Sequence, residues 1–201
     1  SKLKFKWFGI FGGAAILIYI LVFASVKFGF IDNLPLLRDY QKNRIVSFFV
    51  PTEKNEAHYQ QENSVIAIGS GKLFGKGINN DSPNSVKNGN WLAEAQNDFI
   101  FSVVGEEVGF FGCMIIMLLY IYLIISCIIV ASKQRVYYKN LICIGVACWL
   151  GIQTFINIGV ATSMMPNTGV PLPFFSQGGS SLLSVYMGMG FVLNIRREVG
   201  V

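Results

Sequence analysis

Acidic side chains that could accept a proton gather in one part of this chain. Ten of its eleven acidic residues lie between Asp32 and Glu107. If the segment around Asp98 is helical, Glu94 shares a face with it, because the two are four residues apart. A carboxylate there can act as a general base, or Asp98 or Asn97 can simply cap the following helix. The spacing leaves both roles open for Asp98, and it leaves Glu94 as electrostatic support or as a solvated residue.

Groups that could bind an anion lie in two other places. The first set stands at the expected start of an apolar helix, where free backbone N–H groups favour negative charge; it comprises Ser176, Gly178, Gly179 and Ser180. The second set is Lys72 and Lys76, in a glycine-rich segment. Each has a plain alternative: close helix packing through small residues, or ordinary solvent exposure for the lysines.

Other reactive side chains have simpler interpretations. Glu106 and Glu107 lie just inside an apolar stretch, where ionised groups are costly unless partnered, so we expect a structural partner rather than catalysis. His58 is the only histidine and has no Cys or carboxylate cluster near it in the sequence, which favours an exposed residue over a metal ligand. The four cysteines lack the spacing of a zinc site or a disulfide framework, and are interpreted as small apolar fillers.

The composition indicates a membrane protein. Of the 201 residues, 53% are hydrophobic and 13% charged, and the mean hydropathy is +0.52. The charges cluster and leave long stretches empty, which is the pattern a bilayer imposes. The net charge of +5 does not indicate nucleic-acid binding, because half of the basic residues flank apolar stretches and no basic helix with interleaved aromatics is present.

The apolar stretches predict an all-α, polytopic fold with four membrane-spanning helices. A span needs about 20 apolar residues. We expect the spans at about residues 8–27, 100–132, 141–164 and 179–195. The connecting segments, about 28–99 and 165–178, are then loops, and 39–50 predicts an amphipathic surface helix that stops at Pro51. A signal peptide or a buried soluble helix is an alternative for the first stretch alone, but three more spans follow it.

The basic flanks predict the orientation. Lys and Arg near the span ends stay on the cytoplasmic side, and they cluster before the first span, between the second and third, and after the fourth. Residues 28–99 and 165–178 would therefore be external loops, so the polar chemistry lies outside. The chain begins at Ser1 and enters its first apolar stretch almost at once, so we expect more protein upstream.

Three motifs follow one another in the predicted external and membrane-edge segments. They are IAIGSG (66–71) with FGKG (74–77), DFIFSVVGEEVG (98–109) and GVPLPFFSQGGSSLL (169–183). With DYQKNRI (39–45), they resemble the RodA/FtsW/SpoVE (SEDS) family of peptidoglycan glycosyltransferases in content and order. The resemblance covers nearly the whole chain, and it departs from the family's pattern at Ala93–Asn97, Lys72 and Gln177.

This resemblance implies the fold and the reaction. The family has a ten-helix bundle, of which residues 1–201 would be the C-terminal part, with its last four spans. The implied enzyme polymerises lipid II, an undecaprenyl-pyrophosphate-linked disaccharide-pentapeptide, into glycan strands at the outer face of the bacterial inner membrane. Asp98 matches the family's essential acidic residue. It would take a proton from the incoming sugar hydroxyl in an inverting displacement; the diphosphate leaves as a stable anion, so no second acid is required.

The expected partners follow from the same resemblance. They are lipid II, the nascent glycan strand, membrane lipid and a class B penicillin-binding protein, with the second and third spans as docking surfaces. No cofactor is expected, and a role for a divalent cation stays open. We expect this part alone to be inactive, because upstream helices would supply the other walls of the cavity.

Two other functions are compatible with such a sequence. A lipid II flippase also has glycines, broken helices and charges at membrane depth, but here the charges concentrate at one membrane edge and the third and fourth spans have none along their length. A scaffold for the penicillin-binding protein is the other alternative, and it can coexist with catalysis.

Overall fold

The computed structural model describes much of the chain, in two compact units. The units are Ser1–His58 and Tyr59–Val201. The described residues are 17, 21, 24–27, 38–49, 56–78, 85 and 97–199. Most of the first predicted span, 8–27, and the candidate residue Glu94 lie outside this set.

In the first unit, α2 (Asp39–Phe49) is the predicted amphipathic helix. The side chain of Gln41 accepts a hydrogen bond from the backbone N–H of Arg38 at 3.1 Å, which satisfies a donor at the helix start. Pro51 follows closely, and a proline disfavours helical geometry in the residue before it. The helix is therefore confirmed over residues 39–49, while its place on a membrane surface stays a prediction.

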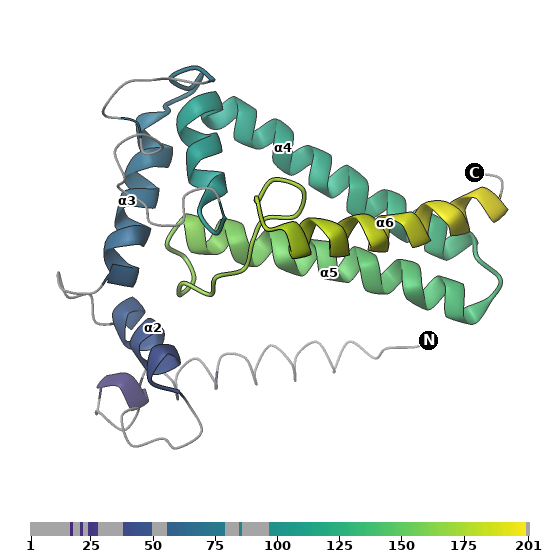
Figure 1. Cartoon of the computed structure of the whole chain (residues 1–201), viewed down its shortest axis with the longest axis horizontal. Helices are drawn as coiled ribbons and strands as arrows, with labels where there is room; N and C mark the ends of the chain where they lie inside the picture. The colour runs from purple at the N-terminus through teal and green to yellow at the C-terminus, as the bar shows by residue number, and fades with distance from the viewer. Residues whose placement is uncertain are drawn as a thin grey trace. The chain divides into compact units, whose positions relative to one another are not determined.

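The described part of the second unit contains helices, a short connection between α4 and α5, and a structured loop between α5 and α6. Its helices are α3 (Glu56–Ser70), α4 (Ile100–Lys133), α5 (Tyr137–Ala161) and α6 (Gly179–Val199). The described part of the chain contains helices and no strands, as the all-α prediction requires. Helices α4, α5 and α6 pack against one another lengthwise, and α3 lies across one end of them (Figure 1).

Two of the described helices are long and apolar enough to cross a membrane. They are α4, with 34 residues, and α5, with 25 residues. Helix α6 covers the fourth predicted span, 179–195, but its sequence is less apolar. The count of four spans thus stays a prediction for the first and fourth segments.

Basic residues gather at the end of the unit opposite α3. The short connection between α4 and α5 lies beside the end of α6 (Figure 1), and Gln134 donates a hydrogen bond to the carbonyl of Ile195 at 3.0 Å. Lys139 forms an ion pair with Glu198 across this junction. Two of the three flanks predicted to be cytoplasmic are therefore together in space, and the flank before the first predicted span lies outside the described residues.

Small side chains fill the core between α4, α5 and α6. Cys127 and Cys143 lie in one buried cluster with Ala147, and Cys113 is also buried, while Cys148 is exposed. All four thiols are free. Three of the four cysteines therefore behave as the predicted apolar fillers.

Helix α4 is broken by a kink at Gly109. This residue has φ 67° and ψ −168°, a backbone conformation that is essentially restricted to glycine. The break frees the N–H groups of Phe110 and Phe111, and they donate instead to the carbonyls of Lys72 and Leu73, at 2.9 and 3.1 Å. The second predicted span therefore does not run straight, and its first turns lie at an angle to the rest of α4 (Figure 1).

The carbonyls on the other side of the kink are satisfied in the same way. Those of Glu106 and Glu107 accept hydrogen bonds from the backbone N–H groups of Lys76 and Gly77, at 2.9 and 3.0 Å. The segment 71–78 thus replaces the missing helical bonds of α4 one for one. This exchange supplies partners for four backbone groups of α4 next to the kink, and a buried backbone group without a partner is costly.

We expect Gly109→Ala to lower the melting temperature of the full-length protein in detergent. A Cβ atom at this position would lie 2.3 Å from the nitrogen of Gly75, and the positive φ alone costs about 1–3 kcal/mol for a residue with a side chain. Gly190→Ala in α6 is the control, because a Cβ atom there meets nothing within 4 Å. Equal melting temperatures for the two variants would contradict the close packing of segment 71–78 against the kink at Gly109.

Candidate active site

Asp98 lies in a turn directly before α4. The turn comprises Asn97, Asp98 and Phe99, and α4 begins at Ile100. Phe99, rather than Asp98 or Asn97, occupies the N-cap position and has no side-chain capping hydrogen bond. Helix α4 also does not extend back to Asp98, so α4 provides no helical face that Asp98 could share with Glu94.

The turn is anchored on both sides of Asp98. Phe99 is 1% exposed and packs with Ala67 of α3 and Val160 of α5. The backbone carbonyls of Asn97 and Asp98 accept hydrogen bonds from side chains of the loop 162–178 and of α5. Asp98 itself is half-buried. Its backbone is thus held in place while part of the residue stays exposed.

Helix α3 is joined to the ends of α4 and α5 by buried polar side chains. Ser64 forms a hydrogen bond with Ser102 of α4, and its hydroxyl donates to the carbonyl of Ala161 at 2.7 Å. The amide of Gln61 donates to the carbonyl of Met165 at 2.7 Å. These contacts bring the glycine-rich segment that follows α3 beside the first turns of α4.

The two candidate lysines have different surroundings. The ammonium of Lys76 lies 2.7 Å from a carboxylate oxygen of Glu106, whose side chain is 2% exposed. The structural partner expected for Glu106 therefore comes from within the chain. Lys72 is exposed and has a positive φ of 51°, and among the described residues it is the lysine beside the cavity described below.

The candidate anion site divides into a buried and an exposed part. Ser176 is 1% exposed, and its hydroxyl bonds to protein backbone on both sides, as donor and as acceptor. Gly179 and Ser180 are exposed at the start of α6, and the carbonyl of Gly178 accepts from Leu182 at 2.9 Å as the first bond of that helix. Of the four candidates, Gly178, Gly179 and Ser180 retain the geometry of a helix N-terminus.

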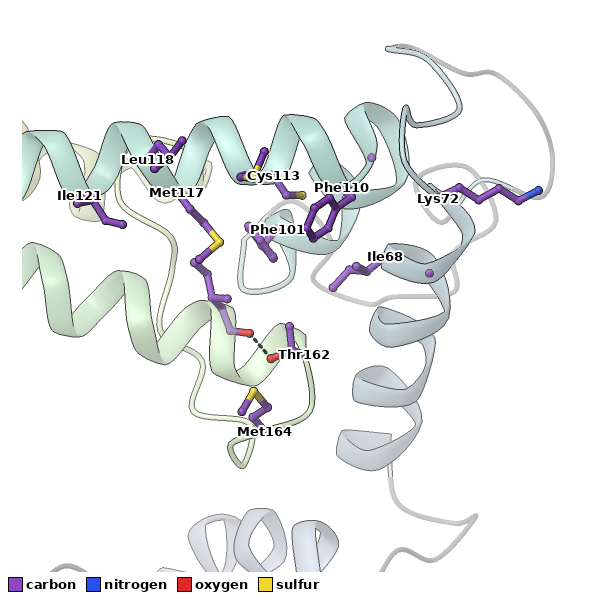
Figure 2. A pocket seen from close by; sticks show the side chains of 15 residues that line it. Ile68, Lys72, Phe101, Phe110, Cys113, Met117, Leu118, Ile121, Thr162 and Met164 are labelled. Atoms are coloured by element: carbon purple, nitrogen blue, oxygen red, sulfur yellow. Dashed lines mark hydrogen bonds between the residues drawn. The ribbon is translucent and has the colours of Figure 1, made fainter. Parts of the chain in front are cut away.

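An apolar cavity of about 720 Å³ opens between α3, α4 and α5. Its lining includes Ile68, Phe101, Phe110 and Met117, which surround the space in Figure 2. The side chain of Lys72 extends away from these residues at one end of it (Figure 2). Within α4 the lining begins at Phe101, three residues after Asp98 in the sequence.

Sequence reasoning missed Gln153 and Asn157 of α5. Both are buried, at 8% and 1% exposure, and their amides donate to the loop 162–178 and to the Asp98 turn. A signal was present, because polar amides inside an apolar span are costly and mark a structural or functional need. Among the described residues, no group of three or more His, Cys, Asp or Glu could hold a metal ion.

The sequence model of one protein family, described as "Cell cycle protein" and covering FtsW, RodA and SpoVE, matches residues 5–200 of the chain. The chain belongs to the FtsW/RodA/SpoVE family. Relatives named "Probable peptidoglycan glycosyltransferase FtsW" include one from Lactococcus lactis, 37% identical over 99% of this chain and 48% of the relative. Another, from Francisella salina, is 33% identical over 97% of this chain and 46% of the relative.

A solved structure has the same arrangement of helices. The structure shows a peptidoglycan synthase complex that coordinates polymerization and crosslinking. The match covers 96% of this chain and 50% of the matching chain in that structure. The TM-score is 0.66 at 28% identity. The chain therefore spans about half the length of the relatives it matches. FtsW-family proteins are membrane proteins, in agreement with the two apolar helices.

The family-like motifs, far apart in the sequence, meet at one end of the second unit. Segment 71–78 exchanges backbone hydrogen bonds with the kink of α4, and residues of 169–183 bond to the Asp98 turn. The turn thus lies between the other two motifs. In this FtsW-family chain, the motifs of residues 66–77, 98–109 and 169–183 are therefore close together in space.

Proposed function

We propose that the protein containing this chain is a peptidoglycan glycosyltransferase that polymerises lipid II into glycan strands. The observation that carries the proposal is the carboxylate of the half-buried Asp98, held in a turn where the three family motifs meet. The names of the relatives support the reaction class. One carboxylate is sufficient for this reaction, because the diphosphate leaving group is stable as an anion.

In the proposed mechanism, Asp98 acts as a general base. Its carboxylate accepts the proton of the attacking sugar hydroxyl while the oxygen forms a bond to the anomeric carbon of the second sugar. The bond from that carbon to the undecaprenyl pyrophosphate breaks on the opposite face, with inversion, and the electron pair leaves with the diphosphate. General-base catalysis usually raises the reaction rate by about 10²–10⁴-fold.

The substrate's diphosphate and its hydrocarbon chain need separate surroundings. The exposed start of α6, at Gly178, Gly179 and Ser180, offers backbone N–H groups to the diphosphate, and Lys72 offers an exposed ammonium. Lys76 is already paired with Glu106, so we assign it to structure first. The apolar cavity between α3, α4 and α5 has the character that an isoprenoid chain requires.

We expect Lys72→Ala to raise the KM for lipid II about fivefold, with a smaller change in kcat, because an exposed charge contributes little more than about 1 kcal/mol. The measurement is the initial rate of polymerisation against lipid II concentration in detergent. Lys133→Ala, at the far end of α4, is the matched control. An unchanged KM would remove Lys72 from the diphosphate site.

The active side would be external, at the outer face of the bacterial inner membrane. The Asp98 turn and the basic junction of α4, α5 and α6 lie at opposite ends of α5 (Figure 1), and basic flanks stay cytoplasmic. An Asp98→Cys variant should react with a membrane-impermeant thiol reagent added to intact spheroplasts. Labelling only after lysis would place Asp98 on the cytoplasmic side and contradict the proposed orientation.

The partner in this proposal is a class B penicillin-binding protein. The solved relative comes from a complex that joins polymerization to crosslinking. Exposed apolar side chains on α4 and α5, such as Tyr122, Ile125 and Phe155, suit the expected docking of a partner's membrane helix.

Gel analysis of labelled lipid II tests the function directly. The full-length protein, with its penicillin-binding partner in liposomes, should convert lipid II into a ladder of glycan strands. Movement of lipid II between leaflets without any strands would support the flippase instead. The lack of charges within residues 141–161 and 179–195 favours polymerisation, because a polar headgroup crossing the membrane needs polar groups along its path.

A further inference from the structure

Two backbone carbonyls at the catalytic turn need partners from outside α4. Asn97 and Asp98 precede the N-cap residue Phe99, so their carbonyls cannot enter the hydrogen-bond ladder of the helix. Both carbonyls instead accept from side chains much later in the chain, 79 residues away for Ser176 and 59 residues away for Asn157. The turn is therefore held by tertiary contacts.

Ser176 bridges this turn and the loop 162–178. Its hydroxyl donates to the carbonyl of Asn97 at 2.6 Å and accepts from the backbone N–H of Leu172 at 2.7 Å. The residue is 1% exposed. One buried hydroxyl thus satisfies a donor in the loop and an acceptor in the turn, and it is not presented to solvent.

Asn157 makes a second bridge from α5. Its side-chain amide donates to the carbonyls of Asp98 and Val170, both at 2.8 Å, so the two N–H groups are directed to the turn and to the loop. The residue is 1% exposed. One helical turn earlier, Gln153 donates to the carbonyl of Pro171 at 2.9 Å.

The loop between these bridges is itself tied to the helices. Tyr120 of α4 donates a hydrogen bond to the carbonyl of Pro173, and the rings of Phe174 and Tyr186 meet edge to face with centroids 5.9 Å apart. Leu172 is 1% exposed. A loop fixed at this many points can define the position of what it holds.

We propose that Asn157 and Ser176 are positioning residues for Asp98, so that the loop 162–178 sets the geometry of the general base. This inference rests on the proposed function of Asp98. Neither side chain needs to contact the substrate, because each acts on the backbone that carries the carboxylate. A misplacement of about 1 Å at a catalytic group can cost about 100-fold in rate.

Steady-state kinetics of the full-length protein with its partner test the inference. Ser176→Ala and Asn157→Ala should each lower kcat about 10- to 100-fold, with KM for lipid II unchanged within about twofold. Asn140→Ala is the matched control, because Asn140 donates in the same way to a backbone carbonyl, Ala131, at the opposite end of α5. A wild-type kcat for both Ser176→Ala and Asn157→Ala would overturn the proposal.

The Asp98→Asn background separates positioning from a general loss of structure. If Ser176 acts through Asp98, then Ser176→Ala should lower the residual rate of Asp98→Asn by less than about twofold, since the two changes remove the same contribution. A full repeat of the single-variant loss in this background would overturn the proposal. Should Asn157→Ala fail to fold, the comparison of Ser176→Ala in the wild-type and Asp98→Asn backgrounds still tests the proposal.

The same set distinguishes failure of the inference from failure of the proposed function. Full activity of Asp98→Asn would remove the general base and leave nothing to position. If Asp98→Asn is inactive while Ser176→Ala and Asn157→Ala are fully active, Asp98 remains the general base. Only the positioning role of Ser176 and Asn157 is then rejected.

Discussion

Asp98→Asn will reduce the rate of glycan polymerisation by about 10²–10⁴-fold, the usual contribution of a general base. The amide has nearly the same shape as the carboxylate but cannot accept the proton of the sugar hydroxyl. Because the turn is held through its backbone carbonyls, the substitution should leave the fold and the melting temperature nearly unchanged. The measurement is the amount of glycan ladder formed from labelled lipid II by the full-length protein with its partner.

The matched control for this loss is Glu62→Gln. It makes the same change from acid to amide on an exposed position of α3, and it should polymerise at the wild-type rate. Co-purification with the penicillin-binding protein should survive in both variants. A wild-type rate for Asp98→Asn would require another proton acceptor.

Lys76→Met will destabilise the protein by about 1–3 kcal/mol, the usual cost of leaving a buried acceptor without its donor, because the Glu106 side chain is buried while that of Lys76 is 30% exposed. The carboxylate of Glu106 is 2% exposed and lies 2.7 Å from the lysine ammonium. It also lies in the first turns of α4, an apolar helix, where a charge without its counter-ion is costly. Thermal unfolding of the purified full-length protein measures the effect.

A double variant identifies the cause of this loss. Lys76→Met with Glu106→Gln removes both charges, and removing both partners of an ion pair costs less than removing one of them. We therefore expect the double variant to recover most of the stability. Lys72→Met is the control, because Lys72 is exposed in the same segment. A double variant as unstable as the single one would show that the charge pair is not the cause.

The amino-acid pattern was sufficient for the elements that depend on local rules. The apolar pattern predicts a helix at about residues 100–132, and α4 is Ile100–Lys133. The amphipathic spacing before Pro51 predicts α2. Both follow from hydrophobic periodicity and from proline geometry, which act over a few residues. The family motifs likewise indicate Asp98 as the candidate base, because the matching residues stand next to it in the chain.

The details of the site depend on contacts between residues distant in the chain. The kink at Gly109 persists because segment 71–78 replaces the lost helical bonds, and nothing in the run 98–109 alone shows that such a segment is near. The same holds for the pairing of Lys76 with Glu106, 30 residues away. A straight helix was the reasonable expectation from local pattern.

By itself, the sequence determined an all-helical chain with apolar helices, clustered basic flanks and an acidic candidate at position 98. Only the tertiary structure decided that Asp98 precedes α4 in a turn, and that Ser176 faces inward to hold this turn instead of facing a ligand. The physical reason is the need for hydrogen-bond partners. Buried carbonyls outside a helix must find donors wherever the fold places them, and here those donors come from 59 and 79 residues away.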